Sequence, residues 1–293
     1  MQHFADRLHQ AVDRVGSPVC VGLDPVLERL PSELEGASPT QRIEAFCRGV
    51  TDAVSGKVAM VKPQLACFER HGSAGWAVYE RIVDHAKSAG LLVLADAKRG
   101  DIGISAAHYA AALIEGEHAA DALTVNPYLG PDTLEPFVET AARTGTGVFA
   151  LVRTSNPGSD ALQSLKLTDG RTVAEAVADT VREIGAKHLG DCGESLLGAV
   201  VGATKAEDAA LLRKRMPEQV FLLPGYGAQG ATADDVRVCF HEKHDGEPLP
   251  RGAIVTASRT VIYAFDEDAD DWRDAVHRAA ERFADEVREA LLR

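Results

Sequence analysis

Residues 91–101 of the chain, LLVLADAKRGD, begin as an apolar run and end in charged residues. Side chains two residues apart in a strand share one face, so Leu94, Asp96 and Lys98 lie on the same side of this segment. The apolar start predicts a buried strand. The charged end predicts that a carboxylate and an ammonium group meet where the strand leaves the core, with Asp101 three residues further on.

Seven other short apolar runs, most of them rich in β-branched residues, recur along the chain. They are PVCVGL (18–23), VAMVKP (58–63), ALTVNP (122–127), GVFALV (147–152), LLGAVV (196–201), VFLLPG (220–225) and GAIVTA (252–257). Amphipathic stretches long enough for helices separate most of them, as at 74–89, 103–115, 132–142, 173–187 and 204–216. Alternation of strand and helix predicts a parallel sheet with right-handed crossovers.

Eight strand–helix units favour an α/β fold of the closed (β/α)8 type, with residues 1–293 forming a single domain. A doubly wound open sheet is the alternative. Apolar residues on one helical face predict helices over residues 4–15 and 272–292, the second packing on the outside of the barrel. Residues 155–170 and 240–251 hold extra polar material and are predicted to be surface insertions in loops.

The composition excludes several classes of protein. With 45% hydrophobic and 26% charged residues, the chain is expected to be soluble and globular. It holds no apolar run of the roughly 20 residues that a membrane span needs. A formal net charge of −13 argues against nucleic acid as a partner. Five cysteines without a C-x-x-C pair, and no signal-peptide pattern, predict a cytoplasmic protein with reduced thiols.

A second lysine is expected beside the charged end of the third strand. In residues 58–64, VAMVKPQ, Lys62 continues the apolar face of the preceding strand. Two lysines and two aspartates, Lys62, Lys98, Asp96 and Asp101, are therefore predicted to converge at one end of the barrel. Alternating opposite charges can keep all four groups ionised near neutral pH. A salt-bridged strand end without chemistry is the alternative.

Polar residues also follow the first, fourth and fifth strands. Asp24 ends the first strand in GLDP, Asn126 follows the fourth, and Thr154 and Ser155 follow the fifth. Their amide and hydroxyl groups could bind the edge of a polar ring, which makes Asn126 and Ser155 candidates for substrate binding. Equally, Asp24 could start a turn and Asn126 could cap the next helix or turn.

The seventh strand leads into PGYGAQG (224–230), whose glycines match G-x-G-x-x-G. A dinucleotide site needs an acidic residue at the end of the next strand, but that strand ends in Ser258 and Arg259. A glycine loop followed by a basic residue instead matches the phosphate site of many barrels, and flexible turn glycines are the alternative. HEKH (241–244) lacks the spacing of a zinc motif and predicts a solvated loop. We expect neither a cofactor nor a metal.

These segments resemble the orotidine 5'-phosphate decarboxylase family, in particular its longer bacterial form. The match rests on DAKRGDI (96–102), the family's D-x-K-x-x-D-I signature, with GLDP, VKPQ, NPY, PGYGAQG and SRT in the family order between about residue 17 and residue 264. The D-x-K-x-x-D core is shared with Mg²⁺-dependent sugar-phosphate decarboxylases and aldolases, one of which is the alternative. Lys62, Gln229 and Arg259 favour the orotidine 5'-phosphate decarboxylases. A catalytically silent phosphate-binding barrel is a further alternative, against which the four charged residues argue.

The resemblance implies a homodimeric (β/α)8 barrel with active sites at the subunit interface. Such an enzyme converts orotidine 5'-monophosphate to UMP and CO2 in de novo pyrimidine biosynthesis without a cofactor. By matching positions, the resemblance implies a charged tetrad of Lys62, Asp96, Lys98 and Asp101, with Asp101 and Ile102 reaching into the partner subunit's site. It also implies that the insertions 155–170 and 240–251 lie beside the pyrimidine and phosphate loops.

Roles for the remaining site residues also follow from the resemblance. Asp24 is similar to the residue that binds the ribose hydroxyls, Ser155 to the one that contacts the pyrimidine, and Gln229 and Arg259 to the phosphate ligands. Loss of CO2 from C6 of orotate leaves a carbanion that the ring delocalises poorly. We therefore expect Lys98, held between two aspartates, to stabilise that charge and then to protonate C6.

Overall fold

The computed structural model describes residues 1–34, 37–227, 230–243, 246–266 and 271–293. Within these residues, eight parallel strands pair in sequence order, and the last pairs with the first. The strands are β1 (Val19–Leu23), β2 (Met60–Pro63), β3 (Leu92–Arg99), β4 (Ala122–Val125), β5 (Gly147–Arg153), β6 (Ser195–Val201), β7 (Gln219–Pro224) and β8 (Ala253–Ala257). All eight predicted strands and the closed barrel are confirmed. The open sheet is excluded because β1 and β8 are hydrogen-bonded neighbours.

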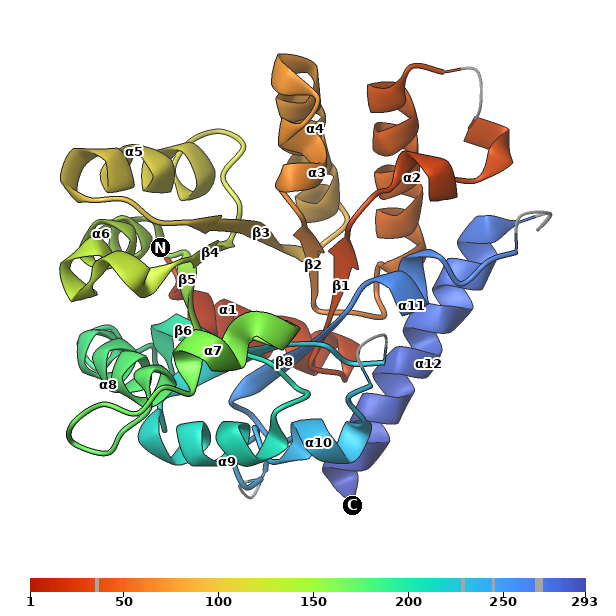
Figure 1. The fold of residues 1–293 in the computed structure, drawn as a ribbon. Coiled ribbons are helices and arrows are strands. Elements are labelled where there is room, and N and C mark those ends of the chain that lie inside the picture. The colour runs from red at the N-terminus through yellow and green to blue at the C-terminus, as the bar shows by residue number, and fades with distance from the viewer. Residues whose placement is uncertain (35–36, 228–229, 244–245, 267–270) are drawn as a thin grey trace.

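Helices surround the strands (Figure 1). The α-helices are α1 (Phe4–Val15), α2 (Pro39–Val54), α3 (Ala66–Glu69), α4 (Gly72–Ser88), α5 (Gly103–Ile114), α6 (Glu135–Thr144), α7 (Asp160–Gln163), α8 (Val173–Gly185), α9 (Ala206–Arg215), α10 (Ala233–Arg237), α11 (Arg259–Ile262) and α12 (Trp272–Leu292). Short 3-10 turns are η1 (Leu27–Arg29), η2 (Ser32–Leu34), η3 (Pro127–Leu129), η4 (Pro131–Thr133) and η5 (Pro157–Ser159). Among the described helices, none combines the length and the apolar character that crossing a membrane requires.

The strands are buried on both sides, which explains why they appear in the sequence as continuous apolar runs. Every residue of β1, β2, β4, β6 and β8 is buried. Large side chains fill the barrel, among them Met60 and Phe149, each fully buried. The barrel is therefore a packed core, and chemistry is confined to its ends.

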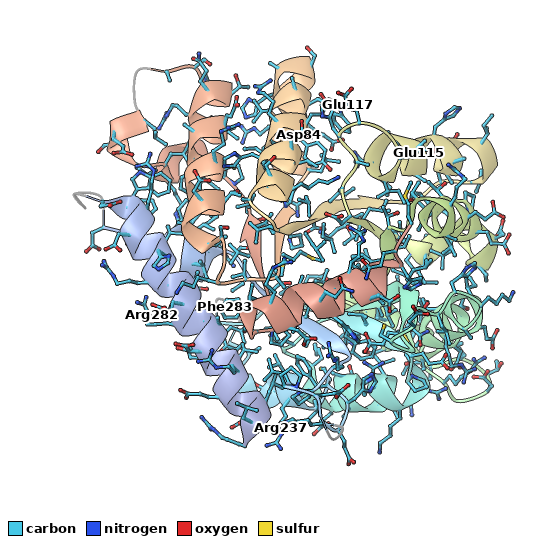
Figure 2. All side chains as sticks on the ribbon, turned by 180° about the vertical axis from the view of Figure 1, so that it is seen from behind. Asp84, Glu115, Glu117, Arg237, Arg282 and Phe283 are labelled. Atoms are coloured by element: carbon cyan, nitrogen blue, oxygen red, sulfur yellow. The ribbon has the colours of Figure 1, made fainter. Side chains whose placement is uncertain are left out.

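Helix α1 crosses the end of the barrel at which the strands begin, as the view from behind shows (Figure 2). The ring of Phe4 packs edge-on against Phe149 with the ring centroids 5.8 Å apart. A Cβ atom on Gly147 would lie 2.4 Å from the Phe4 ring, so the close approach of α1 requires glycine at the start of β5. Arg7 donates to Asp121 at 2.5 Å, which ties the helix to the residue before β4.

The two extra segments lie at opposite ends of the barrel. Residues 155–170, with η5 and α7, follow β5 at the C-terminal end, where they were expected. Residues 240–251 were expected beside the phosphate loop, and that expectation is wrong. Arg251 Nη2 lies 3.0 Å from Asp13 Oδ2 of α1, because a segment that leads from a helix into a strand returns to the N-terminal end of the barrel.

The prediction of a solvated loop at 241–244 is confirmed for Glu242 and Lys243, which are exposed, and is wrong for His241. His241 is partly buried and its Nε2 lies 3.5 Å from Oε1 of the buried Glu194. Phe240 and Leu249 are buried as well. Although the segment is rich in charged residues, His241, Phe240 and Leu249 therefore anchor it to the barrel. His244 lies outside the described residues.

Candidate active site

A cavity of about 670 Å³ opens where the strands end. Seven of the ten predicted site residues line it, namely Asp24, Lys62, Asp96, Lys98, Asn126, Ser155 and Arg259. They come from segments spread over more than 230 positions of the sequence, between residues 24 and 259. Closure of the barrel brings these segments to one face, which is where parallel (β/α)8 barrels carry their chemistry.

Asp96 stands between two lysines at the ends of β2 and β3. Lys62 Nζ donates to Oδ2 of Asp96 at 2.6 Å, and Lys98 Nζ donates to Oδ1 at 2.5 Å. Both side chains of the Lys62–Asp96 pair are less than a tenth exposed, whereas that of Lys98 is 47% exposed. The Lys62–Asp96–Lys98 array thus consists of a buried ion pair, Lys62–Asp96, and the more exposed ammonium group of Lys98 at the cavity.

The electrostatics of the array follow from burial and charge. Burial alone would raise the pKa of the Asp96 carboxyl, but the neighbouring Lys62 and Lys98 outweigh it and hold that pKa well below its usual range. Burial would likewise lower the pKa of Lys62, but the negative charges of Asp96 and Asp24 raise it above its usual range. Asp96 and Lys62 therefore remain ionised at neutral pH.

Two further polar side chains complete the environment of Asp96. Gln64 Nε2 donates to Oδ2 at 3.1 Å, and the Thr124 hydroxyl donates to Oδ1 at 3.0 Å. Thr124 also accepts from the backbone N–H of Lys98 at 2.9 Å. Lys98 is the non-glycine residue with a positive φ, 47°, within the described chain, and its bond to Thr124 helps to hold this strained conformation.

Asp96 has no oxygen left for a cation. Its two carboxylate oxygens accept hydrogen bonds from two lysines, an amide and a hydroxyl. A metal ion at Asp96 would have to displace these donors, so this carboxylate acts as a partner for ammonium groups.

Asp101 and Ile102 lie apart from this array within a single chain. Neither lines the cavity, and Oδ1 of Asp101 accepts the backbone N–H of Ile102 at 2.8 Å. Ile102 is 61% exposed although its side chain is large and apolar. The sequence pattern predicted that four charged groups converge, and one chain brings three of them together.

Asp24 lines the cavity and has one carboxylate oxygen without a partner in the described part of the chain. Its Oδ1 is buried and has no hydrogen-bond partner among the described residues. Its backbone carbonyl accepts from the Tyr263 hydroxyl at 3.0 Å, which positions the end of β1. Buried acceptors are usually satisfied, so Oδ1 is suited to a hydroxyl donor of a bound molecule.

The structure distinguishes Thr154 from Ser155. The Thr154 hydroxyl donates to Asn156 Oδ1 at 2.6 Å and accepts from Gln163 Nε2 at 2.8 Å, so loop contacts occupy it. The Ser155 hydroxyl lines the cavity and bonds to no other residue in the described part of the chain. Ser155 is therefore the hydroxyl available to a ligand.

Gln163 closes this side of the site, and nothing in the sequence pointed to it. It lies in α7, inside an extra segment, and also accepts from Thr154 N at 2.8 Å. The buried Arg153 holds α7 through an ion pair with Asp160, and a second ion pair joins it to Asp208 of α9. Apolar residues beside it, including Leu162 and Val177, form a wall of the cavity.

Asn126 caps the turn that follows β4, as one of the two alternatives predicted. Its Oδ1 accepts from Tyr128 N at 3.1 Å and so caps η3. The residue also lines the cavity, with its amide nitrogen free of bonds to other described residues.

The glycine loop and Arg259 lie at the far side of the cavity. Pro224, Gly225 and Tyr226 line it, and Gly225 has a φ of 107°, a conformation that favours glycine. Arg259 is exposed at the start of α11, and no carboxylate among the described residues pairs with it. Gln229, the other predicted phosphate ligand, lies outside the described residues. Arg259 and the glycine turn after β7 thus line the same cavity.

Comparison with known proteins agrees with this geometry. Residues 17–269 match the model of the orotidine 5'-phosphate decarboxylase / HUMPS family. Orotidine 5'-phosphate decarboxylase of Rhodopirellula baltica is 43% identical over 95% of this chain and 97% of its own. The Salinispora tropica enzyme of the same name is 42% identical over 99% of both chains. The structure of Leishmania donovani OMP decarboxylase, 30% identical, superposes with a TM-score of 0.78 and covers all of both chains.

Proposed function

This chain belongs to the orotidine 5'-phosphate decarboxylase / HUMPS family, and we propose that Lys98, held against Asp96 at the mouth of the barrel, carries out its reaction. Relatives that align with nearly the whole chain are orotidine 5'-phosphate decarboxylases. The activity is that of a carboxy-lyase, which converts orotidine 5'-phosphate to UMP and CO2 in pyrimidine biosynthesis. The Lys62–Asp96–Lys98 array is the observation that carries the mechanism.

Lys98 supplies the charge and the proton. When the bond from C6 to the carboxylate breaks, CO2 leaves and the electron pair stays on C6. An ammonium group already aimed at that carbon stabilises the developing charge without reorganising. It then donates its proton to C6, and the resulting amine takes a proton from solvent. Lys62, Gln64 and Thr124 keep Asp96 in place, and Asp96 keeps Lys98 directed into the cavity.

The rest of the cavity binds the parts of the nucleotide that do not react. The unused oxygen of Asp24 accepts a ribose hydroxyl, and the free hydroxyl of Ser155 meets the pyrimidine edge beside Asn126. Arg259, with the glycine turn after β7, binds the phosphate together with Gln229. Contacts to the distant phosphate then contribute to the chemical step by holding the reacting carbon against Lys98.

A second copy of the chain completes each site in this proposal. Asp101 does not line the cavity of its own chain, and Ile102 and Ile104 beside it expose large apolar side chains at 61% and 75%. Exposed apolar residues at a strand end favour burial against another subunit. The partner's Asp101 then supplies the fourth charge to the array. A cytoplasmic location is also part of the proposal, because all five cysteines, each within the described residues, are free thiols.

The decisive experiment is a spectrophotometric assay of the purified chain with orotidine 5'-phosphate, with and without EDTA. We expect turnover that the chelator does not change. A Mg²⁺-dependent sugar-phosphate enzyme would instead be inactive on the nucleotide and would lose its own activity in EDTA. Absence of turnover in both conditions, with the protein folded and UMP bound, would overturn the proposal.

A further inference from the structure

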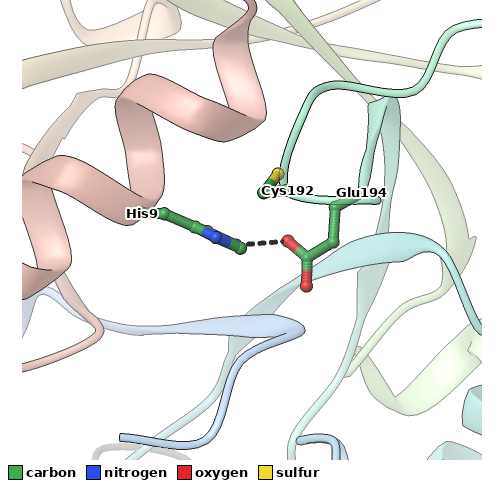
Figure 3. Close-up of side chains that lie close together, drawn as sticks. All are labelled: His9, Cys192 and Glu194. Atoms are coloured by element: carbon green, nitrogen blue, oxygen red, sulfur yellow. Dashed lines mark hydrogen bonds and ion pairs between the residues drawn. The ribbon is translucent and has the colours of Figure 1, made fainter. Parts of the chain in front are cut away.

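A cluster of metal-ligating side chains lies at the other end of the barrel from the substrate cavity. His9 of α1, Cys192 and Glu194 place one nitrogen, one sulfur and one oxygen atom within 4.8 Å of one another (Figure 3). His9 Nε2 and Glu194 Oε2 are 2.7 Å apart. None of the three lines the cavity at the strand ends. The proposed decarboxylation therefore leaves this cluster unexplained.

One carboxylate oxygen of Glu194 lacks a hydrogen-bond partner in this cluster. The residue is only 5% exposed, and its Oε1 is buried without a hydrogen-bond partner among the described residues. Nε2 of His241 forms a long ion-pair contact with it at 3.5 Å, which is beyond good hydrogen-bonding distance. A buried carboxylate oxygen left in this state costs free energy unless another group satisfies it. A simple ion pair between His9 and Glu194 would account for Oε2 and not for Oε1.

His241 provides a fourth ligand on the open side of Glu194. The segment before β8 brings it there, and Gly252 makes the room, since a Cβ atom at that position would lie 2.6 Å from the imidazole ring. Two imidazoles, one thiol and one carboxylate are thus contributed by three separate segments of the chain. Nitrogen, sulfur and oxygen ligands in this number are the set that zinc takes in tetrahedral sites.

The backbone around the cluster is already organised. Cys192 and Glu194 sit in a tight turn in which Gly190 N donates to Glu194 O at 2.9 Å and Gly193 adopts a φ of 81°. Asp6, one helical turn before His9, accepts from Cys192 N at 2.8 Å. Carboxylates that fix the orientation of ligand-bearing segments are common around metal sites.

We propose that His9, Cys192, Glu194 and His241 bind one zinc ion, which links α1 to the N-terminal end of the barrel. The ion enters between His9 Nε2 and Glu194 Oε2 and takes the place of their shared proton. Ligand atoms around tetrahedral zinc stand about 3.3–3.8 Å apart, so this pair opens slightly while Cys192 and His241 close in. The Cys192 thiol releases its proton to solvent as the sulfur binds.

Charges near the cluster suit a divalent ion. Glu194, Asp6 and the Cys192 thiolate would carry three negative charges around it. The guanidinium of Arg213 is also nearby, but backbone carbonyls such as those of Gly252 and Gln219 accept its hydrogen bonds, at 3.0 and 2.7 Å. Arg213 keeps its one positive charge, and the three negative charges outweigh it, so the net charge of these groups is negative.

The test uses the full chain, stripped of metal with a chelator and desalted. Titration with ZnCl2 in a calorimeter should show one ion bound per chain, and zinc should raise the melting temperature. CoCl2 should produce the intense visible bands of tetrahedral cobalt and a near-ultraviolet band from thiolate to cobalt. Cys192→Ser should abolish the thiolate band, and His9→Asn, which keeps a donor for Glu194, should weaken zinc binding by more than about 100-fold.

His118→Ala is the matched control, because His118 forms a similar pair with Asp84 at 2.8 Å without a thiol nearby. It should leave zinc affinity unchanged. All three variants should retain decarboxylase activity, which shows that they fold and separates this test from that of the proposed function. Absence of stoichiometric zinc binding, a cobalt spectrum without the thiolate band, or equal binding by wild type and Cys192→Ser would each overturn the proposal.

Discussion

Lys62 and Asp96 form a buried ion pair, 2.6 Å from Nζ to Oδ2, on adjacent strands of the barrel. A buried charge is tolerated only while its partner remains, so removing either one leaves the other uncompensated. The pair therefore links the stability of the barrel to the position of Lys98, which shares the same carboxylate.

The first prediction concerns the energy of this pair. Lys62→Met should lower the free energy of unfolding by about 3 kcal/mol, because Asp96 loses its buried partner. Adding Asp96→Asn should recover part of that loss, so that the two changes are clearly non-additive in a double-mutant cycle measured by urea denaturation. Lys57→Met, which breaks the exposed pair with Glu281 at 2.7 Å, is the control and should cost less than about 1 kcal/mol. Additive effects would contradict the coupling.

The second prediction concerns pH. The low pKa of Asp96 means that its stabilising contribution is complete above the ordinary aspartate pKa of about 3.9 and is lost as the pH falls below it. The raised pKa of Lys62 means that its contribution is complete below about 10.4 and is lost as the pH rises beyond it. The difference in unfolding free energy between wild type and the double variant should therefore stay constant from about pH 5 to pH 9 and shrink below about pH 4. Urea titrations at a series of pH values measure it, and a marked change between pH 5 and 7 would show that the pair titrates there instead.

The third prediction tests Lys98 as the source of charge and proton. Lys98→Ala should lower kcat by at least about 10⁴-fold, since it removes electrostatic stabilisation and proton donation together. Binding of UMP, measured by calorimetry, should change by about tenfold or less, because the phosphate and ribose contacts remain. Lys87→Ala on α4, whose ammonium group donates to the Ala119 carbonyl, is the control and should be fully active. Near-normal turnover in Lys98→Ala would rule out the mechanism.

The fourth prediction concerns the pyrimidine contact. Ser155→Ala should lower kcat/KM by about tenfold, the value of one lost hydrogen bond, without lowering the melting temperature. Thr154→Ala should instead loosen the loop that Gln163 closes and should lower its resistance to proteolysis, since the Thr154 hydroxyl bonds within that loop. An unchanged kcat/KM in Ser155→Ala would mean that its hydroxyl does not meet the substrate.

The fifth prediction concerns the shared site. Asp101→Ala and Lys98→Ala chains should each be inactive, but hybrid dimers made from both contain one site with neither change. Random exchange of subunits should then restore about a quarter of wild-type activity, as two-fold symmetry requires. Activity that stays at the level of the separate variants, in a mixture shown by mass spectrometry to contain hybrids, would argue against sites built from two subunits.

Much of the substrate cavity could be predicted from the sequence, because strand periodicity is local. Lys62 and Asp96 each end a buried apolar run, and the alternation of faces places them at the strand ends. Closure of the barrel then brings neighbouring strand ends together. Thr124 lies on the same face as Asn126 by the same rule, so its contact with Asp96 could have been inferred.

Contacts between distant segments could not be predicted in this way. His9 and Glu194 are 185 residues apart, and only the crossing of α1 over the start of the strands brings them together. The position of 240–251 was predicted wrongly, because a polar composition does not indicate at which end of the barrel a loop lies. Gln163 gave no signal, since its role depends on how Arg153 anchors α7.

The placement of α1 also determines from which end of the barrel the cavity can be reached. Phe4 packs against Phe149 at the N-terminal end of the barrel, and buried side chains fill the interior, so within the described residues the cavity at the strand ends is closed off from the opposite end of the barrel. The nucleotide of the proposed reaction therefore enters, and both products leave, where the cavity opens at the strand ends. In the proposed reaction, CO2 and UMP therefore leave by the same end of the barrel, and contacts that hold UMP at the strand ends lie along the path by which CO2 departs.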